Sequence, residues 1–213
     1  HLWYRRQRHM CIRDINNNFT IYDQSDSTKL VRNCMRDSDI DTKQYSPKRI
    51  QAHISSLKNQ RILPGEAVEF AQSFFDVKVA EIYSSYQKKL MLANSMDFDD
   101  LLIKAVELLE TSDKSLNYWS SKFQYIMIDE YQDTNMVQYR LVELLASKHK
   151  NICVVGDSDQ SIYAFRGADI RNIEEFESDF KDAKVISLEK NYRSSQKILD
   201  IANAVISNNP RKK

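Results

Sequence analysis

Glycine is scarce in this chain of 213 residues, which has only Gly65, Gly156 and Gly167. A phosphate-binding loop of the form GxxxxGK(S/T) needs two glycines at that spacing and a lysine directly after the second. None of the three glycines meets this requirement, and no glycine is followed by lysine. The sequence as given therefore contains no P-loop.

Cysteines are also few, and long apolar runs are absent. Cys11, Cys34 and Cys153 are odd in number and far apart, which predicts reduced thiols in a cytoplasmic protein rather than a disulfide framework. No cysteine and histidine residues are grouped at the spacing of a metal site. No run reaches the roughly 20 apolar residues of a membrane span, and no signal peptide opens the chain, so we expect no membrane partner.

Neither sign of charge is in excess, because 31 Lys and Arg residues face 30 Asp and Glu residues, for a net charge of +1. Without a global basic field, any nucleic-acid site must come from local patches. The hydrophobic fraction of 42% and the charged fraction of 29% are ordinary for a globular protein. A chain of this length can bury a real core in one or two domains.

The segment 23–92 has a helical pattern. Before it, a basic and aromatic start without an initiating methionine suggests a fragment, and residues 19–22 alternate like a strand. Ser46, directly before a proline, predicts a helix start, and Pro64 ends that helix. A longer helix is expected next. Its apolar positions, spaced for burial, are Val68, Phe70, Ala71, Phe74, Phe75, Val79, Ile82, Tyr83 and Tyr86.

Beyond Asn94, strands and helices alternate. The expected strands are residues 123–128, a near-continuous apolar run buried on both faces, residues 152–155, also buried, and residues 185–188. The residues expected to begin helices are Asp97, Thr134-Asn135, Asp169 and Ser194-Ser195. This alternation predicts a parallel α/β sheet. An all-helical insert at residues 23–96 therefore precedes the α/β part.

Polar residues follow each expected strand. Asp129 and Glu130 come after the first, at the sheet edge where open α/β folds bind ligands. An aspartate there can hold Mg²⁺ on a nucleotide, and a neighbouring glutamate can orient or deprotonate the attacking water. Most isolated Asp-Glu pairs only form a polar turn, so these two residues alone leave both interpretations open.

The second strand is followed by Gln160, which could contact a terminal phosphate. Tyr163 and Phe165 would face the same way on an extended segment, beside Arg166. Aromatic faces with an arginine stack unpaired bases without reading their sequence. Taken singly, each ring is more readily explained as a core residue.

The third strand is followed by Tyr192 and Arg193. Arg193 could reach a transferring phosphoryl group, and Tyr192 could stack on a base. The alternative is a loop that opens a helix and carries a solvated arginine.

The three segments together, in this order, resemble the UvrD/Rep family of superfamily 1 DNA helicases. Residues 129–134, which read Asp-Glu-Tyr-Gln-Asp-Thr, look like its motif II, and residues 156–169 look like its motif III. Residues 191–194, which read Asn-Tyr-Arg-Ser, look like motif IV, and residues 97–102 match a further signature. Residues 1–23 resemble the lead-in to a helical subdomain called 1B. The resemblance covers essentially the whole chain.

The resemblance implies an α/β fold with a parallel RecA-like sheet of the P-loop NTPase type, incomplete and interrupted by an all-helical inserted subdomain. Residues 1–22 and 97–213 would form a partial RecA-like domain 1A, and residues 23–96 would form subdomain 1B. The family's P-loop would lie upstream of His1 and its second RecA-like domain beyond Lys213. We therefore expect a fragment inactive by itself, whose parent translocates on single-stranded DNA and unwinds duplex by ATP hydrolysis.

The resemblance also implies a cofactor pair, ATP and Mg²⁺, and a role for each polar residue. Asp129 would coordinate Mg²⁺ through the nucleotide, and Glu130 would activate the hydrolytic water. Gln160 would sense the γ-phosphate and link it to DNA. Tyr192 would stack on adenine, and Arg193 would stabilise the charge of the transition state.

For DNA, the resemblance implies that Tyr163 and Phe165 stack against single-stranded bases, with Arg166 supporting the contact. The family usually has tryptophan where Phe165 stands, so this chain offers a smaller stacking area. The implied partners are single-stranded DNA and junctions of single-stranded with duplex DNA. Repair or replication proteins are further candidate partners.

Two other interpretations compete with this one. The helicase part of a helicase-nuclease more often resembles a lysine at the position of Asp159 and phenylalanine at that of Tyr192, so the residues present favour the UvrD/Rep branch. A non-catalytic DNA-binding protein that lost its P-loop should have eroded its catalytic positions. Glu130, Gln160 and Arg193 are all intact, which argues against such decay.

Overall fold

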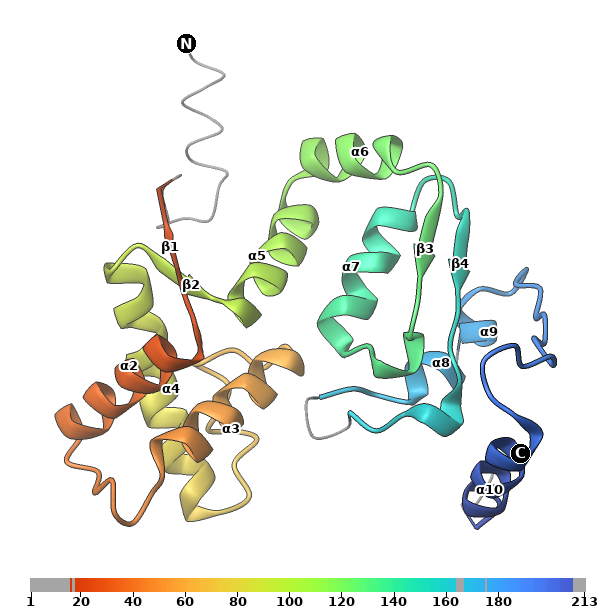
Figure 1. Cartoon of the computed structure of the whole chain (residues 1–213). Coiled ribbons are helices and arrows are strands. Elements are labelled where there is room, and N and C mark those ends of the chain that lie inside the picture. Colours follow the sequence, from red (N-terminus) through yellow and green to blue (C-terminus); the bar gives the residue numbers. More distant parts are fainter. Residues whose placement is uncertain (1–15, 17, 164–166, 175, 209–213) are drawn as a thin grey trace.

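The computed structural model describes residues 16, 18–163, 167–174 and 176–208. A helical part and an α/β part lie side by side, with α5 and α6 passing from one to the other (Figure 1). The helical part and the two connecting helices contain β1 (Thr20–Tyr22), α2 (Gln24–Asp37), α3 (Pro47–Asn59), α4 (Phe74–Leu92), β2 (Ser95–Asp97), α5 (Phe98–Thr111) and α6 (Asp113–Lys122). The α/β part contains β3 (Ile126–Ile128), the 3₁₀ turn η1 (Tyr131–Asp133), α7 (Met136–Ala146), β4 (Ile152–Val154), the 3₁₀ turn η2 (Ser158–Gln160), α8 (Arg171–Glu174), α9 (Phe176–Asp179) and α10 (Gln196–Ile206).

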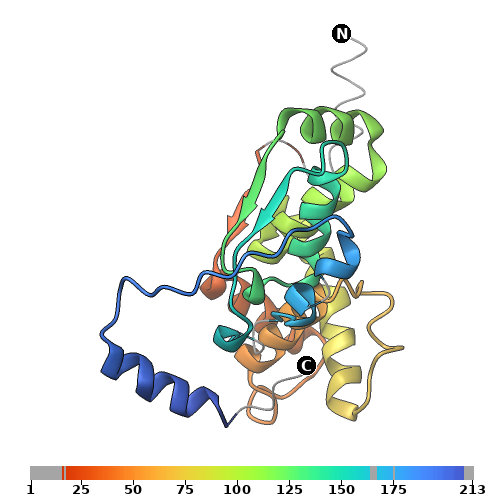
Figure 2. The ribbon, with the colours of Figure 1, turned by 90° about the vertical axis from the view of Figure 1, so that its right-hand side faces the viewer.

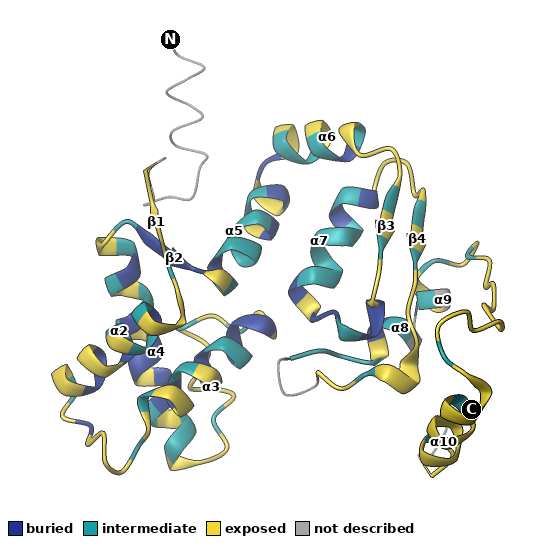
Figure 3. Cartoon of the chain, in the orientation of Figure 1, coloured by how far each residue is buried: buried dark blue, intermediate teal, exposed yellow. Residues whose placement is uncertain are grey.

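The helices of the helical part begin at residues whose side chains can satisfy free backbone N–H groups. Asp23 accepts a hydrogen bond from the N–H of Asp26 at 2.8 Å and so begins α2. Ser46 and Pro47 begin α3, as predicted, although the side chain of Ser46 makes no capping hydrogen bond and the start rests on the proline. The buried apolar residues of α2, α3 and α4 form one core, and buried residues are dark blue on the ribbon in Figure 3. Members of this core include Val31, Met35, Ile50, Ile54, Val79, Ile82, Tyr83, Tyr86 and Leu90.

The predicted long helix is shorter than expected. It begins at Phe74, and Val68, Phe70 and Phe74 are each more than half exposed, so the prediction that they are buried was wrong. The side chain of Ser73 accepts from the N–H of Asp76 at 3.2 Å, which begins the helix at this point rather than earlier. The periodic pattern holds from Phe75, which packs partly buried against the core, and from Val79 onward the predicted positions are buried.

The helical part is bounded by two short strands that pair in parallel, Thr20 with Ser95 and Tyr22 with Asp97. Strand β1 was expected from the sequence but β2 was not, since residues 95 and 96 were expected inside an all-helical insert. The two ends of the helical segment therefore lie side by side.

The α/β part has a second parallel pair, β3 and β4, with Ile126 beside Ile152 and Ile128 beside Val154. Helix α7 lies on one face of this pair, and α5 and α6 pack against α7 (Figures 1 and 2). Val106, Leu109, Val137 and Leu144 form the core there. The helix α6 was not predicted from the sequence.

No described element covers the other face of the pair, so the prediction of strands buried on both faces was wrong. Met127 is 75% exposed, and Cys153 is also exposed. The prediction of a third strand at 185–188 was wrong as well. That segment is irregular and its apolar side chains are exposed, because it does not pair with β3 or β4. It leads into α10, which stands away from the other helices (Figure 2).

The observed class is thus mixed α/β, with short parallel sheets and many helices. Within the described residues, no helix combines the length and the apolar character needed to cross a membrane.

Candidate functional site

The turn after β3 carries the first candidate residues, and its backbone is held by β4. The N–H of Val155 donates to the carbonyl of Ile128 at 2.8 Å, and the N–H of Tyr131 donates back to the carbonyl of Val155 at 3.0 Å. Asp129 and Glu130 lie between these two bonds, both exposed. The carboxylate of Asp129 accepts from the N–H of Glu130 at 2.9 Å.

Glu130 has a left-handed backbone, with φ of 51° and ψ of 44°. A residue with a side chain adopts this region rarely, and such conformations gather at functional sites. Here the turn aims the Glu130 side chain back over η1, where its Oε2 accepts from Nε2 of Gln132 at 2.7 Å.

Gln132 joins this turn to the loop after β4. Its side-chain oxygen accepts from the N–H of Asp157 at 3.0 Å, and the Asp157 carboxylate accepts from Nε2 of Gln160 at 2.8 Å. One chain of hydrogen bonds therefore runs from Glu130 through Gln132 and Asp157 to Gln160. The predicted residues Asp129, Glu130 and Gln160 are brought together at one edge of the sheet.

The close approach of the two loops requires glycine at position 156. A Cβ added there would lie 2.7 Å from Oε1 of Gln132 and 2.8 Å from Cδ1 of Ile173. Since Gln132 is buried and hydrogen-bonded at both ends, it cannot move aside cheaply.

We expect Gly156→Ala to lower the free energy of unfolding by about 1–3 kcal/mol, the usual range for overpacking. Gly65→Ala is a matched control, because a Cβ at Gly65 meets nothing within 4 Å. Urea unfolding of both variants measures the difference. Equal stability of the two variants would contradict the tight contact between the loops.

The DNA-binding candidates are only partly covered by the structure. Tyr163 is 38% exposed, so the rest of the protein covers this side chain only in part. Phe165 and Arg166 lie outside the described residues. Just beyond them, Gly167 has a φ of 84° and packs against Asn59, whose Cβ would lie 3.1 Å from a Cβ at Gly167.

Tyr192 and Arg193 lie on the irregular segment directly before α10. Helix α10 stands away from the other helices (Figures 1 and 2). Tyr192 is 86% exposed, and Nζ of Lys190 lies 5.1 Å from its ring centre. Asn191 shapes the turn, since its side-chain oxygen accepts from the N–H of Arg193 at 2.9 Å and from that of Ser194 at 2.8 Å. The structure does not bring Arg193 into the hydrogen-bond chain of Glu130.

A buried ionic group, missed by the sequence analysis, joins α3 to α5. Lys58 is 1% exposed, and its ammonium lies 2.6 Å from Asp97 and 2.8 Å from Asp100. Burial raises the pKa of Asp100 despite the nearby ammonium. Burial acts in the same direction on Asp97, but Lys58 and hydrogen bonds from the Asp100 N–H and the Tyr86 hydroxyl together hold the pKa of Asp97 below its usual range.

The residues Asp97 and Asp100 also form a capping box that begins α5, so this family signature has a structural role. Next to it, the side chain of Asn135, which begins α7, donates to Oδ1 of Asn59 at 2.7 Å. The helical part is thereby attached directly to the end of motif II. A lone lysine or asparagine in a helix carries no sequence signal for such a junction.

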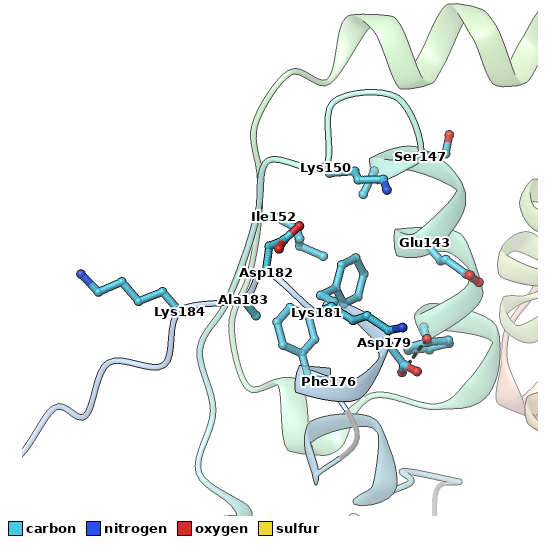
Figure 4. A pocket seen from close by; sticks show the side chains of 13 residues that line it. Glu143, Ser147, Lys150, Ile152, Phe176, Asp179, Lys181, Asp182, Ala183 and Lys184 are labelled. Atoms are coloured by element: carbon cyan, nitrogen blue, oxygen red, sulfur yellow. Dashed lines mark hydrogen bonds between the residues drawn. The ribbon is translucent and has the colours of Figure 1, made fainter.

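A hollow of about 810 Å³ lies elsewhere, between α7, β4 and α9 (Figure 4). Its charged lining residues are Glu143, Lys150, Asp179, Lys181, Asp182 and Lys184. Both signs of charge are mixed there, and Lys184 points away from the hollow. None of the candidate residues that the structure describes lines it. Within the described part of the chain, no group of three or more His, Cys, Asp or Glu residues could hold a metal by itself.

Comparison with known proteins identifies the family. A family model described as the UvrD/REP helicase N-terminal domain matches residues 2–181. The chain belongs to this family. The resemblance drawn from the three motifs is therefore confirmed.

Curated members of the UvrD/REP family align with the chain along its whole length. The ATP-dependent DNA helicase PcrA of Staphylococcus aureus (strain Mu50) is 45% identical over 221 aligned positions, which cover 100% of this chain and 30% of that protein. PcrA of Staphylococcus epidermidis (strain ATCC 12228) has the same identity and coverage. The chain thus spans about a third of the length of these relatives.

Proposed function

We propose that this chain is part of an ATP-dependent DNA helicase and contributes half of its ATP site and part of its single-strand track. The hydrogen-bond chain from Glu130 to Gln160 carries the proposal, because it couples a water-activating carboxylate to a residue suited to contact a terminal phosphate. The P-loop and a second RecA-like domain would come from the rest of the polypeptide. The complete polypeptide would consist of this chain joined to those two parts.

The candidate residues fit ATP and Mg²⁺ in chemistry. The exposed carboxylate of Asp129 is the hard oxygen donor that Mg²⁺ prefers, and the ion would take its other ligands from phosphate and water. Bound Mg²⁺ would neutralise charge on the phosphates. Glu130 would orient and deprotonate the attacking water, and Gln160 would contact the γ-phosphate.

Tyr192 and Arg193 would act on the nucleotide from the other side, by stacking on adenine and by stabilising transition-state charge. Their exposure supports this role, since both groups are available to a ligand or to a second domain. Tyr163, Phe165 and Arg166 would hold single-stranded DNA, including the strand at a junction with duplex.

The same proposal assigns the domains. Residues 1–22 and 97–213 would belong to an incomplete RecA-like domain, and residues 23–96 to the helical subdomain inserted into it. The parallel pairing of β1 with β2, at the two ends of the helical segment, supports the insertion.

ATP hydrolysis, measured with and without a single-stranded oligonucleotide, tests this function. The chain as given should show no turnover, whereas the complete polypeptide should show turnover stimulated by the oligonucleotide. Turnover by the chain alone would mean that another group cradles the phosphates. A complete polypeptide without DNA-stimulated turnover would refute the proposed helicase.

We expect Phe165→Ala in the complete polypeptide to weaken single-strand binding by roughly 1–3 kcal/mol, the usual contribution of one base stacked on an aromatic ring. Fluorescence anisotropy at fixed salt measures the affinity, because phosphate contacts make it salt-dependent. Phe70→Ala, which removes a ring that is 58% exposed in the helical part, is the matched control. Unchanged affinity after Phe165→Ala would assign that ring to the core.

A further inference from the structure

Gln132 lies at the centre of the candidate site but faces no solvent. Only 1% of its surface is exposed, although it sits in the turn between two exposed functional segments. A buried amide must satisfy both its donor and its acceptor, and Gln132 does so with one group from each segment. Its Nε2 donates to Glu130 at 2.7 Å, and its Oε1 accepts from the N–H of Asp157 at 3.0 Å.

The surroundings of Gln132 leave it one orientation. Gly156 closes against its side-chain oxygen, where even a methyl group would clash. The hydroxyl of Ser161 lies 3.4 Å from its backbone carbonyl, so the loop after β4 also touches Gln132 from a second direction. If the amide flipped, its NH₂ group would face the N–H of Asp157, and two donors cannot form a hydrogen bond with each other. The donor therefore always faces Glu130.

From this geometry we infer that Gln132 is a positioning residue, which holds the Glu130 carboxylate for its reaction with water and ties that orientation to the loop bearing Gln160. The inference rests on the proposed ATPase function. Its physical basis is that the left-handed turn at Glu130 leaves the carboxylate exposed, and the hydrogen bond from Gln132 is what restricts its rotation.

Gln132→Glu separates positioning from mere support of the loop. A glutamate has the same shape and can still accept from the N–H of Asp157. The variant loses the N–H group that donates to Glu130. In place of that group it has a carboxylate oxygen, about 3 Å from the carboxylate of Glu130. Two carboxylates so close cannot both ionise freely, so one of their pKa values rises.

The test compares the complete polypeptide with its Gln132→Glu variant by kcat and KM for ATP across the pH range. We expect kcat at neutral pH to fall by at least about tenfold, and the acidic limb of the kcat profile to move to higher pH, because the base must lose its proton beside another negative charge. KM for ATP should change far less, since Asp129 and Gln160 remain. A kcat profile that keeps its shape, whether or not kcat falls, would overturn the positioning role.

A double-mutant cycle in thermal unfolding keeps the test independent of catalysis. Gln132→Glu should lower Tm, and adding Glu130→Gln should recover at least half of the loss, because the new glutamine can donate to the new carboxylate. Additive effects would overturn the contact itself. If the unsubstituted complete polypeptide does not hydrolyse ATP, the proposed function fails, and the cycle still decides whether Gln132 holds residue 130.

Discussion

Replacing Glu130 by glutamine is expected to lower the kcat for ATP hydrolysis of the complete polypeptide by about 10²- to 10⁴-fold, the usual contribution of a general base. Nucleotide binding should persist, because the substitution leaves the carboxylate of Asp129 in place. The fold should persist as well, since glutamine is nearly isosteric and its oxygen can still accept from Nε2 of Gln132. Single-turnover hydrolysis and equilibrium nucleotide binding measure the two quantities separately.

Glu107→Gln is the control for this prediction. Glu107 lies on α5, is half exposed and pairs with Lys104, outside the candidate site. Glu107→Gln removes one carboxylate charge, as Glu130→Gln does. It should leave kcat unaltered. Normal turnover in Glu130→Gln would remove Glu130 from the mechanism, and lost nucleotide binding would mean that the residue serves the nucleotide rather than the water.

Lys58→Met is expected to lower the free energy of unfolding at neutral pH by about 3–5 kcal/mol, because it leaves two buried carboxylates without their cation. Methionine fills a similar volume, so the loss reports the charge rather than a cavity. Lys29→Met is the matched control. Its partner Asp26 lies 3.5 Å away at the surface, where such pairs contribute below about 1 kcal/mol. Urea unfolding of both variants gives the two losses.

The Lys58→Met loss should shrink as the pH is lowered from about 7 to about 5. Without the ammonium, burial raises the pKa of Asp97 as it already does that of Asp100, so the folded variant binds protons more readily than the unfolded chain. A group with a raised folded pKa destabilises at high pH, and this penalty is relieved as it protonates. The same loss at both pH values would show that the two carboxylates are solvated in the folded variant.

Capping residues in the sequence predicted the starts of α3, α5 and α7. Asp97 and Asn135 each accept from an N–H three residues further along, and that geometry is contained in a few consecutive residues. The burial of Val79, Ile82 and Tyr83 was predicted correctly, but that of both faces of β3 and β4 was not, because it depends on partners remote in sequence. Among the described residues, the segment 185–188 has the composition of a strand but pairs with neither β3 nor β4, and no helix covers the side of the sheet that Met127 faces.

The candidate site shows the same division. The positions of Asp129 and Glu130 after β3 followed from the apolar run before them. The environment of Gln132 did not, since its side-chain oxygen accepts from the backbone N–H of Asp157, which lies 25 residues away. Lys58 is likewise joined to Asp97 and Asp100 across about forty residues, and its own neighbours in sequence give no hint of a buried charge.

The pairing of β1 with β2 also has a consequence for synthesis. A ribosome adds on the order of 5–20 residues per second, and Thr20 precedes its partner Ser95 by about 75 residues. The first strand therefore waits on the order of 4–15 s before its partner leaves the exit tunnel. In that interval α2, α3 and α4 can form and pack, because helices assemble within microseconds. The topology thus imposes an order on the nascent chain, in which α2, α3 and α4 are complete before the strands on either side of them can meet.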